Sequence, residues 1–177
     1  MKKELYNPEN LKKQAKEKHK ENKSFFAKLQ KQKPKNLDDI VHNLHDIVFD
    51  KTDCLECANC CKSISPIVTD VDIARISKHL RKKPSALIDE YFRLDEDNDY
   101  VFRQTPCPFL MNDNYCSIYE SRPKACREYP HTDRKRFFQI LNLTLKNITV
   151  CPAVYTITEE LKSIKKVWYW QLLFYYV

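Results

Sequence analysis

Four of the chain's eight cysteines fall within eight positions, in the segment CLECANCC. They are Cys54, Cys57, Cys60 and Cys61. Two overlapping CxxC pairs supply thiolates at a spacing from which one ion can take two ligands, and Cys61 adds another thiol. On a regular helix these thiols would form a stripe along one side and could not surround an ion. Further ligands are therefore expected from elsewhere in the chain.

The other four cysteines follow in the second half of the chain, at Cys107, Cys116, Cys126 and Cys151. We expect this half to fold back and bring its thiols to the first group. Eight thiols suffice for two zinc sites of four ligands each, or for one metal site with spare cysteines.

The spacing C-x2-C-x2-C also matches the first three ligands of a bacterial ferredoxin loop around a [4Fe–4S] cluster. The fourth cysteine of that pattern, three residues further on and followed by Pro, is missing. Cys107 and Cys151 are each followed by Pro, and either one could complete a cluster from a distance. Zinc and an iron–sulfur cluster both stay open as the cofactor.

Disulfide bonds are the alternative use of these cysteines. The N-terminal segment is charged throughout and lacks the apolar stretch of a secretory signal peptide, which predicts the cytoplasm. Thiols stay reduced there, and a cysteine pattern more often binds metal. The neighbours Cys60 and Cys61 could pair with each other only in a strained ring. We therefore expect metal ligands.

The chain contains no glycine. A Walker A phosphate loop, a GxGxxG dinucleotide turn and a GxSxG nucleophile elbow all require glycine, so these three classes of enzyme are excluded. Helix C-termini that need a left-handed residue must use Asn or a charged residue instead. This composition suits a helical protein with tight Asn and Asp turns.

The net charge of +7 belongs to an N-terminal arm, residues 1–36. This arm carries twelve Lys and four Glu, whereas the rest of the chain carries 19 basic and 20 acidic residues. Pro8 and the capping residue Asn7 predict an exposed helix over 8–33. Such an arm binds nucleic acid or an acidic partner, or is simply a solvated helix, and we expect the solvated helix. The neutral body has no evident nucleic-acid face.

Residues 37–166 are predicted to form one mainly α domain. Apolar residues from Leu37 to Val48 recur at helical spacing. His42 and His45 lie three residues apart on this helix. The zinc motif HExxH has its two histidines four residues apart and a Glu between them, so we expect ordinary surface histidines here. The further predicted elements are a helix capped by Thr69 and Asp72, a helix from Pro84, a strand over 100–103, paired segments over 106–119, a helical turn carrying Cys126, a helix over 134–147 and a helix from Cys151-Pro152 through Leu161.

Arg122 and Arg127 flank Cys126. Their positive charge would stabilise thiolates and a net-negative centre. The alternative is that they form surface salt bridges to Glu120 or Glu128. Both interpretations stay open.

The last segment, residues 167–177, is aromatic and apolar. Eleven residues cannot span a bilayer as a helix. A packed terminal helix or strand is one prediction, and contact with a membrane interface through its Trp and Tyr residues is the other.

Three segments together carry a resemblance: CLECANCC, then PCPFL with YCSIYESRPKACREYP, then the CP at 151–152. They resemble the YkgJ-type cysteine-cluster family of bacterial zinc- or iron-chelating domain proteins, over roughly residues 50–162. The resemblance implies chelation by all eight cysteines in a cytoplasmic protein. A related cysteine cluster accompanies flagellin lysine methylases. This second likeness implies an alternative function, as an iron–sulfur component of a redox or protein-modifying enzyme. The chain nevertheless lacks a glycine-rich methyl-donor loop.

We therefore expect a small, irregular, mainly helical domain with a short hairpin, organised around a cysteine-metal cluster. The expected function is accessory, non-catalytic metal chelation, with a protein partner that the sequence does not identify. Because ligands distant in sequence must meet, metal binding is expected to supply much of the folding free energy.

Overall fold

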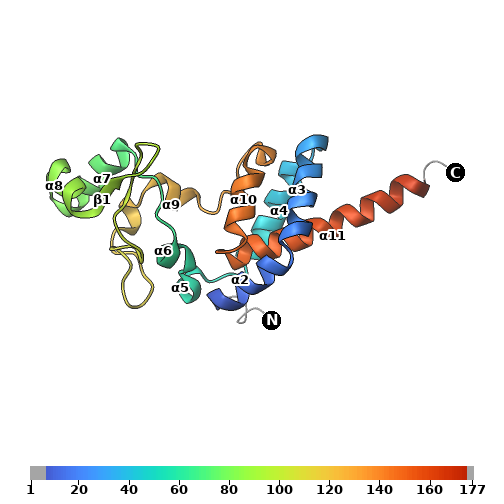
Figure 1. Ribbon diagram of the computed structural model, residues 1–177, viewed down its shortest axis with the longest axis horizontal. Helices are drawn as coiled ribbons and strands as arrows, with labels where there is room; N and C mark the ends of the chain where they lie inside the picture. The colour runs from blue at the N-terminus through green and yellow to red at the C-terminus, as the bar shows by residue number, and fades with distance from the viewer. Residues whose placement is uncertain (1–6, 175–177) are drawn as a thin grey trace. The chain divides into compact units, whose positions relative to one another are not determined.

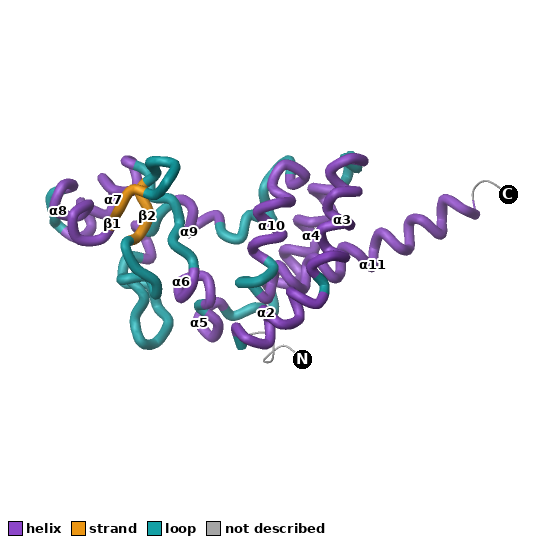
Figure 2. Tube along the Cα trace, viewed as in Figure 1, coloured by secondary structure: helices purple, strands orange, loops and turns teal. Residues whose placement is uncertain are grey.

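The computed structural model describes residues 7–174, with side chains for residues 7–164. This part of the chain is mainly helical and has a short two-stranded antiparallel sheet, as predicted (Figures 1 and 2). Contacts divide the chain into two compact units where one was expected. Unit 1 comprises Met1–Asp53 with Pro130–Val177, and unit 2 is Cys54–Tyr129. This division does not follow the predicted boundaries of 1–36, 37–166 and 167–177.

Unit 1 is built from helices. Its elements are α2 (Pro8–Glu17), α3 (His19–Gln32), α4 (Leu37–Phe49), the 3-10 helix η2 (Phe137–Ile140), α10 (Leu141–Asn147) and α11 (Pro152–Phe174). The Asn7 side chain caps α2, as predicted. The helix predicted over 8–33 is broken at Lys18, and α11 runs beyond its predicted end.

The helix predicted over 134–147 begins only at η2, because Arg136 adopts a left-handed conformation with φ of 59°. The Asp38 carboxylate then accepts hydrogen bonds from the backbone N–H groups of Arg136 and Phe137, at 2.6 and 2.9 Å. A side chain of α4 therefore caps the start of η2.

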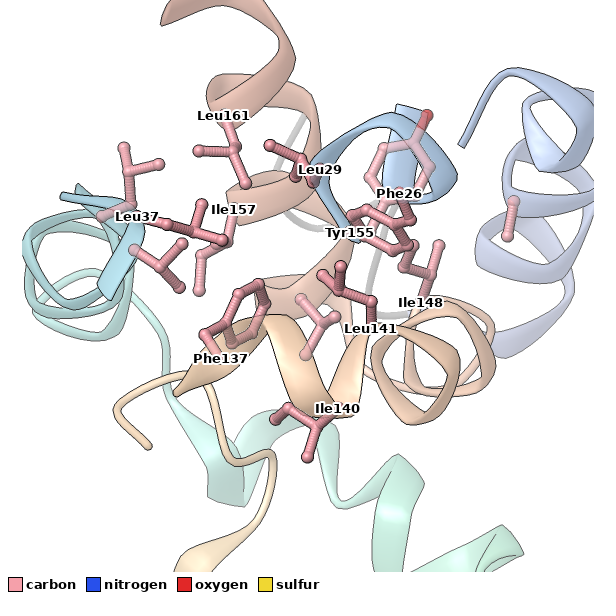
Figure 3. Close-up of a cluster of buried hydrophobic side chains, with 14 of the residues drawn as sticks. Phe26, Leu29, Leu37, Phe137, Ile140, Leu141, Ile148, Tyr155, Ile157 and Leu161 are labelled. Atoms are coloured by element: carbon pink, nitrogen blue, oxygen red, sulfur yellow. The ribbon is translucent and has the colours of Figure 1, made fainter. Parts of the chain in front are cut away.

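The predicted solvated arm is in fact packed. Leu11, Ala15, Phe26 and Leu29 are at most 4% exposed and join the core of unit 1. Figure 3 shows Phe26 and Leu29 beside side chains of α10 and α11. The sequence prediction was wrong here because a few apolar residues at helical spacing bury one face even in a Lys-rich helix.

Unit 2 consists of short elements. They are α5 (Cys54–Cys57), α6 (Asn59–Ser63), α7 (Asp70–Leu80), α8 (Pro84–Tyr91), β1 (Phe92–Leu94), β2 (Tyr100–Phe102), the 3-10 helix η1 (Tyr119–Ser121) and α9 (Lys124–Glu128). The two strands pair antiparallel around the acidic loop, with Arg93 opposite Val101. The predicted capping box of Thr69 and Asp72 starts α7.

Several left-handed positions are occupied by Asn or by a charged residue, as predicted for a chain without glycine. Lys33 and Arg81 end α3 and α7 in this conformation, and Asn98 and Asn114 adopt it in turns. Ala58, between α5 and α6, was not predicted to do so and has φ of 49°.

None of the described helices has an apolar stretch long enough to cross a membrane. The predicted interfacial contact of residues 167–177 depends on side chains outside the described residues.

Candidate metal centre

The CLECANCC segment is not a regular helix. α5 ends at Cys57, Ala58 turns the backbone through the left-handed region, and α6 begins at Asn59. Because the helix axis is interrupted between the second and third cysteines, the thiols do not form one continuous stripe. Cys57 is buried, whereas Cys54 is exposed.

The adjacent thiols of Cys60 and Cys61 lie together. Their sulfur atoms are 3.9 Å apart. Four sulfurs at zinc–sulfur bonding distance around one ion would be about 3.8 Å from each other. These two sulfurs therefore already have the separation that a shared tetrahedral ion requires.

Two hydrogen bonds join this segment to the predicted pair of segments over 106–119. The backbone N–H of Cys107 donates to the carbonyl of Cys61 at 2.8 Å, and Asn114 Nδ2 donates to the carbonyl of Leu55 at 2.6 Å. Leu110 and Cys116 form an antiparallel bridge, which confirms that residues 106–119 fold back on themselves. Cys107 and Cys116 are thereby brought to the early cysteines.

Several of the thiols act on one another electrostatically. Burial, together with the charge of the Cys61 thiolate, raises the pKa of Cys107 to about 11 and that of Cys126 to about 12. Cys116 contributes to both shifts as well. Like charges raise each other's pKa only when they are close. Cys61, Cys107, Cys116 and Cys126, which come from three separate segments, are therefore close enough for the charges of Cys61 and Cys116 to act on the thiols of Cys107 and Cys126.

Cys61 differs from these thiols. A hydrogen bond from the Cys60 thiol, helped by the charge of Lys62, lowers the pKa of Cys61 to about 7 against the opposing effect of burial. The thiolate, rather than the thiol, is the form that binds metal. Among Cys61, Cys107, Cys116 and Cys126, only Cys61 has a lowered pKa and is therefore held closest to the thiolate form.

Arg122 supports negative charge in the same region. Its guanidinium lies 3.7 Å from the centre of the Tyr119 ring, and its Nη1 donates to the Tyr119 carbonyl at 2.6 Å. Burial raises the pKa of Cys116 and of Cys126, and the charge of Arg122 opposes both shifts. Arg127 is exposed, and Glu128 forms its ion pair with Lys124 at 3.6 Å.

The residues that hold α9 in place were not predicted as part of the site. Asp72 and Arg75 of α7 form hydrogen bonds to the backbone at Ser121, Arg122 and Lys124. The sequence marked Asp72 only as a capping residue of its own helix. A side chain that serves two helices at once leaves no sequence signal of its second role.

Cys151 lies in unit 1, where it packs against the apolar core. Its role as a ligand stays a prediction. His42 Nε2 is 3.2 Å from the Arg134 carbonyl oxygen, and His45 Nδ1 is 2.7 Å from Thr132 Oγ1. His45 also stacks on Phe49. Both histidines have such contacts within unit 1, as expected of ordinary histidines.

Comparison with protein families gives one match, to the CxxCxxCC family, described as "Putative zinc- or iron-chelating domain", over residues 53–151. The chain belongs to the CxxCxxCC family. The matched region contains all eight cysteines of this family member, Cys151 included. No curated protein and no solved structure matched the chain.

The thiols of this CxxCxxCC protein fit the group that its family description names. Zinc and iron both bind cysteine thiolates, and a cation would offset the repulsion that raises the thiol pKa values. Among the described residues, no three Cys, His, Asp or Glu side chains are arranged around one point as ready ligands. No disulfide bond joins the eight cysteines, all of which lie in the described part. Seven of these thiols belong to unit 2 and one, Cys151, belongs to unit 1.

Proposed function

We propose that this protein chelates zinc or an iron–sulfur centre through thiols of unit 2, with Cys61, Cys107, Cys116 and Cys126 as the principal ligands. The observation that carries the proposal is the hydrogen bond of 2.8 Å from the Cys107 N–H to the Cys61 carbonyl, which joins the early cysteines to the segment over 106–119. The effect of the Cys61 charge on the pKa of Cys126 supports the inclusion of Cys126. Cys57 and Cys60, four residues and one residue before Cys61, are candidates for further ligands. A reducing compartment such as the cytoplasm would keep the thiols available.

The proposed role is that of an accessory, metal-chelating protein. The family description names chelation, and the contacts around the cysteines are those that position thiols. The bound metal would supply the charge that holds several thiolates in one partly buried place.

Anaerobic purification of the full chain, followed by elemental analysis and an absorption spectrum, tests the proposal. An iron–sulfur centre would give a brown protein that contains iron and sulfide and absorbs near about 400 nm. Zinc would give a colourless protein with a stoichiometric metal content. A wild-type chain that holds neither metal would contradict the proposal.

Ligand assignment is tested with Cys61→Ser and Cys126→Ser. Each substitution is expected to remove most of the bound metal, since the serine hydroxyl is a poor replacement for a thiolate. Ala125→Ser, on the same helix as Cys126, adds a hydroxyl without removing a thiol and should keep the wild-type metal content. Full retention of metal by both cysteine variants would refute this ligand set.

A further inference from the structure

The segment that leads to Cys126 is held by a buried carboxylate of another helix. The Asp72 side chain is 2% exposed. Its Oδ2 accepts from Thr69 N at 3.0 Å and from Thr69 Oγ1 at 2.7 Å, and its Oδ1 accepts from Arg75 Nη2 at 2.5 Å and from Lys124 N at 3.0 Å. Four donors satisfy the carboxylate, which a buried charge requires. Burial opposes the ionised form, but these hydrogen bonds outweigh it and lower the pKa of Asp72.

Arg75 also forms hydrogen bonds to the backbone of the segment before Cys126. Its Nη2 donates to the carbonyl of Arg122 at 2.8 Å and its Nε donates to the carbonyl of Ser121 at 3.3 Å. Between these carbonyls and the N–H of Lys124 stands Pro123, which has no N–H to donate. The pair Asp72 and Arg75 thus binds the backbone on both sides of Pro123.

Helix α9 depends on this pair because it lacks an N-cap of its own. Its N-cap position is Pro123, and no side chain of that residue caps the helix. A helix of one turn is not stable alone in water. Asp72 accepts the N–H of the first helical residue and places a negative charge at the helix N-terminus, which is what a capping side chain does.

Cys126 is the third residue of α9. Its backbone N–H donates to the carbonyl of Pro123 at 3.0 Å. The position of its thiol therefore follows from the position of the segment that Asp72 and Arg75 hold.

We propose that Asp72 and Arg75 are positioning residues of the metal centre, which set the place of the Cys126 thiol from outside the ligand set. This inference rests on the proposed function of the cysteines. Outer partners that orient a ligand commonly change metal affinity when they are removed, although they never touch the ion.

The sharpest test compares Lys124→Pro with Lys124→Ala in the full chain. Pro is suited to the first position of a helix, and the residue before it already has the extended conformation that Pro requires, with Pro123 at φ −51° and ψ 149°. Lys124→Pro therefore deletes the N–H that donates to Asp72. Lys124→Ala removes the same exposed side chain, including its ion pair with Glu128, and keeps that N–H.

Zinc affinity is measured by competition with a chromophoric chelator, and the reactivity of each cysteine by alkylation and mass spectrometry of the reduced, metal-free protein. Lys124→Pro is expected to weaken zinc binding by about 10-fold. Lys124→Pro should increase the alkylation rate of Cys126 several-fold and change that of Cys107 by less than about two-fold. The reason is that the lost hydrogen bond to Asp72 anchors α9 and not the segment of Cys107. Lys124→Ala should match the wild type in both measurements.

Arg75→Lys is the second variant, and it loses the guanidinium fork while it keeps the charge beside Asp72. We expect about a 10- to 100-fold weaker zinc affinity, again with Cys126 as the thiol most affected. Arg81→Lys, at the exposed C-terminal end of the same helix, is the matched control.

The outcomes separate the two proposals. If the wild type binds no metal, the proposed function fails, whatever Cys126 does. If the wild type binds metal and both variants match it in zinc affinity and in Cys126 alkylation, the positioning role alone is overturned. An equal rise in the alkylation of every cysteine also overturns it, because that result indicates general loosening of unit 2.

Discussion

Unit 1 and unit 2 are stabilised by different means. Among the described residues, the apolar core of unit 1 contains fifteen buried side chains, whereas that of unit 2 contains eight, all of them from Val68 to Ile118. The cysteine-bearing helices α5, α6 and α9 contribute no side chain to these clusters. They are held by hydrogen bonds and, in the proposed function, by metal. Apolar packing therefore accounts for unit 1, and it accounts for only part of unit 2.

Metal removal should show the largest difference between the units. Structural zinc contributes an apparent binding free energy of about 10–16 kcal/mol in small domains, which is folding free energy when the site forms only in the folded chain. After chelation under reducing conditions, we expect amide hydrogens of residues 54–63 and 106–129 to lose protection in hydrogen exchange, while α4 and α10 keep theirs. A uniform loss across both units, or no loss in either, would remove the contrast.

A substitution in the apolar core of unit 1 should destabilise unit 1 and leave metal binding by unit 2 unchanged. Leu141 is 1% exposed in the cluster of Figure 3, so Leu141→Ala is expected to cost about 2–5 kcal/mol of unfolding free energy. Leu143→Ala, on the same helix with a 40% exposed side chain, should stay within about 0.5 kcal/mol of the wild type. Urea unfolding followed by far-UV circular dichroism measures both.

Metal content under native conditions completes this test. Leu141→Ala should keep the wild-type amount of metal per chain, because the core that it disturbs contains none of the proposed ligands. Loss of metal in proportion to the loss of stability would show that the two units fold as one.

A smaller effect is expected at the buried amine of unit 1. Lys162 is 8% exposed, and its Nζ lies 2.9 Å from both Glu21 Oε1 and Asn22 Oδ1 and 2.6 Å from Glu159 Oε1. Lys162→Met would leave the buried amide of Asn22 without this donor, at a cost of about 1–3 kcal/mol.

Lys18→Met is the matched control for Lys162→Met. The Lys18 side chain is 42% exposed and pairs with the same Glu159. An ion pair exposed to this extent is worth about 0–1 kcal/mol. Thermal unfolding compares the two variants. Equal losses of thermal stability in the two variants would mean that the burial of a lysine does not determine how much its ion pairs contribute to stability.

The fold was predictable from sequence wherever the signal was local. The capping box at Thr69 and the cap at Asn7 depend on neighbours in the chain, and both are confirmed. The expectation that charged residues take left-handed helix ends is met at Lys33 and Arg81, which were not named in advance. The family was predictable for the same reason, since cysteine spacing is read directly from the sequence.

What the sequence did not reveal depends on contacts between distant residues. The division of the chain into two units requires the N-terminal helices to pack with those after Pro130, and no periodicity encodes that pairing. The second role of Asp72 requires a donor 52 residues away. Lys-rich α2 and α3 were predicted as solvated because charge dominates their composition, although burial depends on the few apolar residues of one face.

The smallest predicted effect concerns the backbone at the break between α5 and α6. Ala58 has φ of 49°, and a left-handed conformation costs a residue with a Cβ roughly 1–2 kcal/mol. Glycine avoids this cost but loses about 0.5–1 kcal/mol more conformational entropy on folding, so Ala58→Gly should stabilise unit 2 by about 0.5–1 kcal/mol. Ala125→Gly, in right-handed α9, should destabilise it by a similar amount.

Hydrogen exchange of the metal-loaded protein measures the two substitutions side by side. Opposite signs are expected, because the same atoms are removed from a left-handed and a right-handed backbone. If both substitutions destabilise unit 2 equally, the turn at Ala58 stores no strain. The break in CLECANCC would then arise from the cysteines' contacts alone. In that case the stabilisation from packing the buried Ala58 methyl group would exceed the energetic cost of its left-handed backbone conformation.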